Sequence, residues 1–220
     1  MKTLFFHIII ISLLCSSFSW SQESFEGIIT YEIELVFKKE NVPHKEYIAQ
    51  KFGDSLKILF NKKGDMYRKY IGAGSRGFDF QIYKAASNKY YCKWKNLDTL
   101  YYYNTKENVL KLTNKEVGTS EAISNKPSKY ILIEGYIPET GEKIRQKVYY
   151  TGFPYLNPAL FKNLKDFFIC DLFKTSKSPF LRIEFELDDY IIIYTAVNIE
   201  RKFLNPKIFK LPQNIPQKKS

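Results

Sequence analysis

Histidine is nearly absent from this chain of 220 residues, which contains only His7 and His44. Because His7 lies in an apolar run near the N-terminus, a Ser-His-Asp or Cys-His catalytic pair would depend on His44 alone. Neither a Gly-x-Ser-x-Gly motif nor a phosphate-binding P-loop occurs. Gly72-Ala73-Gly74 is a fragment of a glycine-rich loop with no helix predicted after it, so we interpret it as a turn. We therefore expect a protein that is not an enzyme and uses no cofactor.

Cysteine is also scarce, with only Cys15, Cys92 and Cys170 in the chain. Two thiols and one histidine beyond the first 21 residues cannot supply the four ligands of a structural zinc site, and we expect no metal. In an exported protein Cys92 and Cys170 can form one disulfide, although the helical position expected for Cys170 points away from the apolar stripe. Glu184 and Glu186 share the solvated face of a predicted strand, so we interpret them as surface charges rather than as a glycosidase pair.

Long runs of basic residues are missing, although the formal net charge is +11. Lysines occur in scattered pairs, such as Lys38-Lys39 and Lys62-Lys63, without the run of about five to eight basic residues that is typical of nucleic-acid patches. We interpret the charge as a generally basic surface and expect no nucleic acid as a partner.

The first 21 residues have the three parts of a secretory signal peptide. Lys2 gives a positive start, residues 4–14 are almost entirely apolar, and Ser19-Trp20-Ser21 places small residues before a cut at Gln22. The apolar run is shorter than the ~20 residues that span a bilayer. We therefore expect a cleaved leader and a periplasmic or secreted location.

A lipoprotein is the alternative for this leader, since Cys15 ends the apolar run. Lipoprotein signals need a small residue directly before the modified cysteine, and Leu14 is bulky, so we do not favour this alternative. The remaining chain fits one domain, which we place at residues 22–212 and expect to be a monomer, with a disordered tail at 213–220.

Alternating apolar and polar residues predict an antiparallel sheet. In residues 29–37 the odd positions are apolar and the even positions mostly polar, as in a strand with one face on a core. Turn sequences such as residues 61–65 and 138–142 separate further alternating segments and predict hairpins. We expect about nine to eleven strands and one or two helices in a mainly β (α+β) domain.

Two stretches are not strands in this interpretation. Residues 114–128 are polar, with Gly118 and Pro127, and we interpret them as a long surface connection. Asn157-Pro158 is the start signature of a helix, and apolar residues follow it at helical spacing up to Leu172.

Three segments carry a family resemblance: residues 25–31 (FEGIITY), residues 149–154 (YYTGFP) followed by Asn157-Pro158, and residues 194–200 (YTAVNIE) leading to FKLP at 209–212. Their layout resembles that of exported Gram-negative proteins of unknown function whose fold is like that of the periplasmic lipoprotein carriers. The resemblance implies a strongly curved antiparallel sheet, or half-open barrel, with helices covering a concave side that holds acyl chains in the carriers.

The resemblance suggests a set of apolar side chains that could line such a concave side. The candidates are Ile29, Ile33, Phe78, Phe80, Trp94, Ile183, Phe185 and Ile193. The same residues could instead fill a closed core, and the pattern does not separate the two.

Two functions follow from these expectations. The first is a non-enzymatic exported protein that binds a lipid, an acyl chain or another apolar ligand in the concave face. The second is a structural or interaction module of the cell envelope, with a filled core, a protein partner and no ligand.

Overall fold

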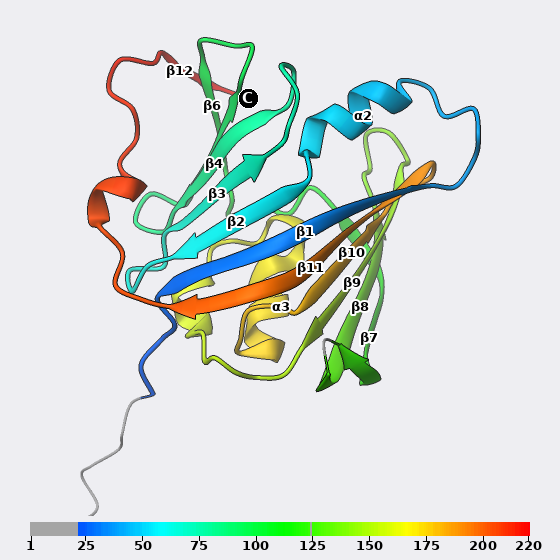
Figure 1. Cartoon of the computed structure of the whole chain (residues 1–220), viewed down its shortest axis with the longest axis vertical. Helices are drawn as coiled ribbons and strands as arrows, with labels where there is room; N and C mark the ends of the chain where they lie inside the picture. Colours follow the sequence, from blue (N-terminus) through cyan, green and yellow to red (C-terminus); the bar gives the residue numbers. More distant parts are fainter. Residues whose placement is uncertain (1–21, 124) are drawn as a thin grey trace, which may run out of the picture.

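The computed structural model describes residues 22–123 and 125–220, which form one sheet and a few short helices (Figure 1). The predicted leader lies outside the described residues. The strands are β1 (Gly27–Phe37), β2 (Ser55–Phe60), β3 (Met66–Ile71), β4 (Phe78–Lys84), β5 (Lys89–Trp94), β6 (Leu100–Asn104), β7 (Lys111–Ile123), β8 (Lys126–Tyr136), β9 (Lys143–Tyr150), β10 (Arg182–Glu186), β11 (Tyr190–Arg201) and β12 (Gln217–Lys219). The helices are α2 (Lys45–Phe52) and α3 (Ile169–Ser176), and the 3-10 turns are η1 (Pro158–Phe161), η2 (Asp166–Phe168) and η3 (Pro206–Phe209).

The strands join in the order β12-β6-β5-β4-β3-β2-β1-β11-β10-β9-β8-β7. Neighbours are antiparallel, except that β12 runs parallel to β6. β1 joins the two halves of the sheet, because it pairs with β2 on one side and with β11 on the other. Within the described residues β12 and β7 end the sheet without pairing with each other, so the sheet is not closed. The prediction of a mainly β domain with an antiparallel sheet is confirmed, with one strand more than expected.

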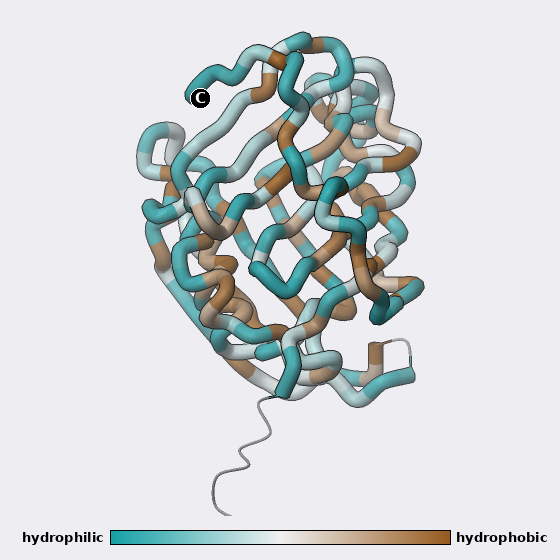
Figure 2. Tube along the Cα trace, turned by 90° about the vertical axis from the view of Figure 1, so that its left-hand side faces the viewer, coloured by the Kyte–Doolittle hydropathy of each residue, from teal (hydrophilic) through white to brown (hydrophobic). Residues whose placement is uncertain are grey.

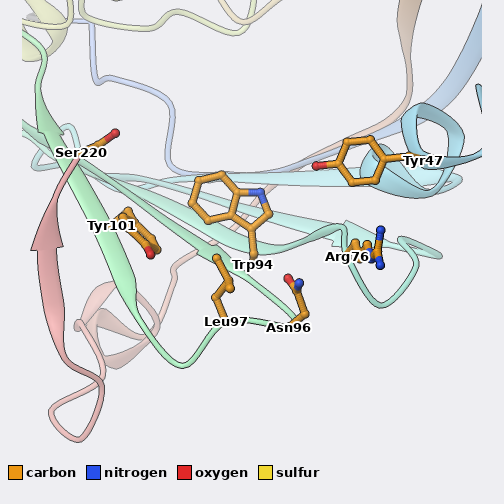
Figure 3. Close-up of a pocket in the computed structure, with 7 residues that line it drawn as sticks. All are labelled: Tyr47, Arg76, Trp94, Asn96, Leu97, Tyr101 and Ser220. Carbon is orange, nitrogen blue, oxygen red and sulfur yellow. The ribbon is translucent and has the colours of Figure 1, made fainter. Parts of the chain in front are cut away.

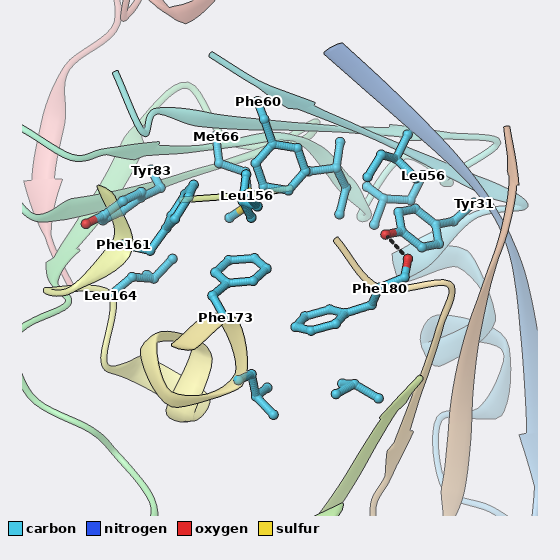
Figure 4. Close-up of a cluster of buried hydrophobic side chains, with 14 of the residues drawn as sticks. Tyr31, Leu56, Phe60, Met66, Tyr83, Leu156, Phe161, Leu164, Phe173 and Phe180 are labelled. Atoms are coloured by element: carbon cyan, nitrogen blue, oxygen red, sulfur yellow. Dashed lines mark hydrogen bonds between the residues drawn. The ribbon is translucent and has the colours of Figure 1, made fainter. Parts of the chain in front are cut away.

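The register divides the side chains between two faces, because cross-strand partners point to the same side. We call the inner face the one that carries Ile29, Ile58 and Val148, on which η1 and α3 pack. One buried cluster joins side chains from both halves of this face with Phe161 of η1 and Phe173 of α3 (Figure 4). The Phe161 and Phe173 rings lie 4.8 Å apart, in the range of favourable aromatic pairs.

The opposite, outer face is covered in part by residues 202–220, which we call the C-terminal segment. Leu204 and Phe209 pack against Leu59, and further along Leu211 and Ile215 pack against a second cluster on β4, β5 and β6. The segment then ends as β12 beside β6 (Figure 1). The last part of the segment is mainly hydrophilic (Figure 2), and its apolar residues Leu211 and Ile215 pack against the sheet, whereas Phe203 at the start of the segment is exposed.

The prediction of a disordered tail at 213–220 is wrong, because β12 occupies residues 217–219 and Ile215 packs on the sheet. The interpretation of residues 114–128 as a surface connection is also wrong, since residues 114–123 belong to β7 and residues 126–128 to β8, and the two strands pair as a long hairpin. β7 is an edge strand whose side chains are nearly all exposed. Its sequence therefore lacks the alternation that marks a strand on a core, and main-chain pairing with β8 holds it in place.

The single helix predicted after Asn157-Pro158 is interrupted in the structure. Asn157 caps η1 as expected, with its side chain accepting a hydrogen bond from the Ala159 amide at 3.0 Å. Phe167 and Phe168 then adopt positive φ angles of 50° and 56°, which stop the helical backbone before α3 begins at Ile169. The spacing of apolar residues alone does not reveal such a break in the helical backbone.

The covered outer face gives a matched pair of substitutions within the C-terminal segment. Phe209→Ala removes a ring that is 2% exposed and is expected to lower the free energy of unfolding by roughly 3–5 kcal/mol. Phe203→Ala removes a ring that is 80% exposed and should change it by less than about 0.5 kcal/mol. Urea denaturation of both variants checks this, and equal stabilities would contradict the packing of this segment.

Candidate functional site

The inner face is filled at one end and partly open at the other. In the filled part, Ile29, Phe60, Phe161 and Leu172 are each at most 2% exposed. Elsewhere on the same face several large side chains keep accessible surface even though they point to the interior side, and we call this part the open half. Its members are Ile33, Leu35, Arg68, Trp94, Tyr103, Ile183, Phe185 and Tyr194.

Arg68 is the charged residue at the boundary between the two parts. It is the inward-facing partner of Ile58 on β2 and of Gln81 on β4. Its Nε is shielded from solvent and has no hydrogen-bond partner in the described part of the chain. Its guanidinium carbon lies 6.0 Å from the centroid of the Tyr90 ring, within reach of a cation–π interaction.

A hydrogen-bonded group of polar side chains surrounds Arg68. The hydroxyls of Tyr70 and Tyr90 donate to Oε1 of Gln81 at 3.1 and 3.2 Å. The amide of Gln81 donates in turn to the sulfur of Cys92 at 3.5 Å. These interactions fix the tyrosine oxygens around the guanidinium and leave the positive charge without a counter-ion.

The electrostatics of this group keep Arg68 charged and its neighbours neutral. Burial works to lower the pKa of Arg68, but the oxygens of the surrounding tyrosines outweigh it and raise the pKa above its usual value. Burial raises the pKa of Tyr90, Tyr194 and Tyr103, so these phenols stay protonated. They can donate or accept hydrogen bonds but carry no negative charge.

Lys51 of α2 is a second cation near the open half of the inner face. Its ammonium nitrogen lies 5.3 and 5.6 Å from the ring centroids of Phe52 and Phe78. Burial lowers its pKa, while the nearby Cys92 and Glu142 act in the opposite direction. Because Arg68 and Lys51 both act on the pKa of Cys92, the two cations lie near the same part of the inner face.

The turn η2 crosses the open half between the two sides of the sheet. Asp166 accepts a hydrogen bond from the Tyr103 hydroxyl of β6 at 2.8 Å, and the adjacent Phe167 packs on Phe185 of β10 with ring centroids 5.5 Å apart. Oδ1 of Asp166 is buried without a partner among the described residues. Burial raises the pKa of this carboxyl to about 6, against the influence of hydrogen bonds from Tyr103 and the Phe167 backbone and of the charge on Arg68.

A pocket of about 700 Å³ opens at the rim of the inner face (Figure 3). Trp94 and Tyr101 form its inner wall, and Tyr47 points toward Trp94 from α2. Two residues further along the same strands, Cys92 and Tyr103 continue this face toward Arg68. The aromatic rim and the polar group therefore lie on one continuous surface of β5 and β6.

Four of the eight predicted lining residues, Ile33, Trp94, Ile183 and Phe185, lie in the open half. Ile29 and Phe78 are on the inner face but are buried in the core cluster. Phe80 and Ile193 point to the outer face, so the expectation that they share a surface with the others is wrong.

Two irregularities explain those last placements. A register shift between Phe78 and Phe80 turns these two consecutive even positions of β4 to opposite faces, and Phe80 stacks on Tyr67 while Phe78 packs on Trp94. In β11 the register shift opposite Thr30 and Tyr31 changes the phase, so the inward residue opposite Ile33 is Tyr194 and not Ile193. A one-residue register shift moves every following side chain to the opposite face of the sheet. The alternation of the sequence alone does not show where such a shift occurs.

The two described cysteines are free thiols, so the disulfide considered from the sequence is absent from residues 22–123 and 125–220. Cys92 is buried on the inner face of β5, and Cys170 lies partly exposed in α3. The described residues also contain no group of three or more potential metal ligands.

The glycine-rich turn is longer than the fragment considered from the sequence, because Gly77 completes the spacing begun by Gly72 and Gly74. The turn joins β3 to β4, so a strand and not a helix follows it, and no helix N-terminus is available for a phosphate. Its role is close packing: the Gly74 amide donates to the Gln50 carbonyl at 2.8 Å, and a Cβ at Gly77 would lie 2.6 Å from that oxygen. The glycines thereby hold α2 at the rim.

Sequence reasoning missed Arg68, Lys51, Asp166 and the tyrosines around them. One available indication was the alternation Met66-x-Arg68-x-Tyr70. In this pattern a charged residue occupies the same face of the strand as apolar and aromatic residues. Asp166 and Lys51 come from other segments, and no local pattern relates them to β3.

The chain matches no protein-family model, and no similar sequence was found among curated proteins. None of the helices in the described ranges is both long and apolar enough to cross a membrane.

Asp166 gives a pH-dependent prediction for stability. Its carboxyl, which faces Tyr103, Tyr90, Cys92 and Arg68, titrates near 3.8 when unfolded and at about 6 when folded. The folded state therefore binds the extra proton between these values and loses stability as the pH rises through them. Asp166→Asn removes this loss, so the stability of the variant relative to wild type should rise by up to roughly 2–3 kcal/mol from about pH 4 to pH 7. Thermal unfolding at several pH values measures this, and a pH-independent difference would refute it.

The thiols give a second prediction. Burial raises the pKa of the Cys92 thiol to about 12, so it should resist alkylation in the folded protein, whereas the more exposed Cys170 should react first. In a chain beginning at Gln22, iodoacetamide followed by peptide mass spectrometry should show modification of Cys170 alone. Without reductant, two thiols should titrate in denaturant, and finding none would indicate a disulfide.

Proposed function

We propose that this is a non-enzymatic exported protein whose sheet forms a half-open barrel and binds a lipid or another apolar ligand in the open half of its inner face. The observation that carries the proposal is the partial exposure of Ile33, Ile183 and Phe185 on the same face that elsewhere forms a sealed core. Accessible apolar surface inside a concave face is costly in water and is a common property of sites for apolar ligands.

The arrangement of the core supports the half-open shape. The inner-face cluster includes Tyr90 and Cys92 from one half of the sheet and Ile131 and Val148 from the other. A flat sheet would hold these strands far apart, since seven or eight strand spacings of about 4.8 Å separate them. A sheet that bends around η1 and α3 brings both halves into one cluster.

An interaction module of the cell envelope is the second candidate, because Ile33, Trp94 and Ile183 also pack against the buried cluster. A basic aromatic surface on β8 and β9 would suit it: the Lys147 ammonium lies 4.3 Å from the Tyr130 ring centroid and 5.1 Å from that of Tyr149. This candidate predicts no ligand and an association with anionic envelope components that weakens with salt.

Native mass spectrometry of protein purified from the periplasm without detergent tests the proposal. We expect a mass beginning at Gln22 with an added lipid mass that disappears on denaturation, and delipidated protein should take up a fluorescent fatty acid. Protein without co-purified ligand that takes up no probe would contradict ligand binding and favour the interaction module.

A matched pair of variants locates the site. Ile183→Trp adds bulk in the open half and should weaken probe binding about tenfold or more, because it occupies space that the ligand needs. Val36→Trp adds the same ring on the outer face, where Val36 is 38% exposed, and should leave probe binding unchanged. Equal affinities for the two variants, with unchanged melting temperatures, would place the probe elsewhere.

A further inference from the structure

Two cations near the open half, Arg68 and Lys51, form no ion pair with a described residue. Nine ion pairs join described residues, and neither Arg68 nor Lys51 takes part in any of them. A charge withdrawn from water is costly unless it is paired and hydrogen-bonded. Two cations on one part of an interior face, without carboxylate partners in the described chain, are therefore an unusual arrangement for a purely structural core.

The side chains around Arg68 do not neutralise it. The side-chain oxygen of Gln81 accepts hydrogen bonds from the hydroxyls of Tyr70 and Tyr90, so it is already occupied. Arg68 acts on the pKa of Asp166, and Glu142 acts on the pKa of Lys51. Asp166, however, is hydrogen-bonded to Tyr103, and neither carboxylate lies within ion-pair distance of its cation. Both cations are therefore left without a carboxylate in direct contact.

The apolar part of the open half adjoins this positive group. Tyr194 of β11 acts on the pKa of Arg68 although β3 and β11 are not neighbouring strands, so the two side chains lie near each other on the inner face. The cross-strand partners of Tyr194 are Ile33 and Ile183, and Phe185 follows on β10. An extended molecule could therefore place one end at Arg68 and its length along these apolar side chains.

We propose that the ligand of the open half is an acyl chain with an acidic end group, whose carboxylate or phosphate lies between Arg68 and Lys51 and whose chain lies along Ile33, Ile183 and Phe185. The proposal rests on the binding of an apolar ligand proposed above and adds the chemistry of its head group. A guanidinium suits this role because its planar donors match the oxygens of a carboxylate or a phosphate.

Competition against a neutral fluorescent probe, N-phenyl-1-naphthylamine, tests the head group in the full mature protein. Palmitate and a palmitoyl lysophosphatidate should displace the probe, and their relative affinities identify which acidic group is preferred. Hexadecanol and methyl palmitate have the same chain without the charge and should bind at least about tenfold more weakly. Acetate and inorganic phosphate lack the chain and should not compete.

Two variants test the named cations independently. Arg68→Met should remove the preference for acid over alcohol, and Lys51→Gln, on the partly exposed α2, should reduce it without a change in melting temperature. Lys57→Gln is the control, because it removes one positive charge from the exposed outer side of β2. If Arg68→Met does not fold, Lys51→Gln and the comparison of acid with alcohol still decide the matter.

The outcomes separate the two proposals. Equal binding of palmitate and hexadecanol, or an unchanged acid preference in both site variants, overturns the acidic head group and leaves apolar-ligand binding intact. Failure of every long-chain compound to bind overturns both. Binding of acetate as tight as that of palmitate shows a simple anion site and overturns the role of the chain.

Discussion

The pairing of β1 with β11 is the interaction on which the rest of the structure depends. It runs from Gly27 opposite Arg201 to Phe37 opposite Tyr190, and it joins strands from the two ends of the chain. On one side of this pair lie the strands that carry Arg68 and its tyrosines, and on the other lie the strands that carry Ile183 and Phe185. Only through this pair do both groups face a common interior, so the candidate site depends on a contact of very long sequence separation.

The inner face combines two requirements that oppose each other. Burying aromatic rings such as Phe60 and Phe161 stabilises the fold through their removal from water, at about 25 cal/mol per Å² of apolar surface. Placing Arg68 and Asp166 next to that core reduces the gain, since each charge loses part of its hydration. The filled end, where η1 and α3 pack, supplies the stability, while the polar and partly exposed end carries the features expected of a binding site. A division of this kind is common where function places polar groups inside a fold.

Much of the fold could be predicted from the sequence, because strict alternation in segments such as residues 29–37 predicts both the strand and the face of it that is buried. The prediction was wrong where the signal is not local. β7 pairs through its main chain with little apolar patterning, the positive φ angles of Phe167 and Phe168 break a helix that side-chain spacing favours, and bulges turn Phe80 and Ile193 outward. The site was harder still, since Lys51, Arg68 and Asp166 lie on three separate elements and meet only in the folded protein.

The C-terminal segment has a consequence for biosynthesis. The outer-face cluster of Phe80, Ile82, Tyr91 and Leu100 is synthesised well before Leu211 and Ile215, which cover it and follow β11 in the chain. A nascent chain that stalls before residue 202 would display these rings, together with the unpaired edge of β6, to every other chain nearby. The interval between the synthesis of β6 and that of Ile215 is thus a period in which self-association competes with folding.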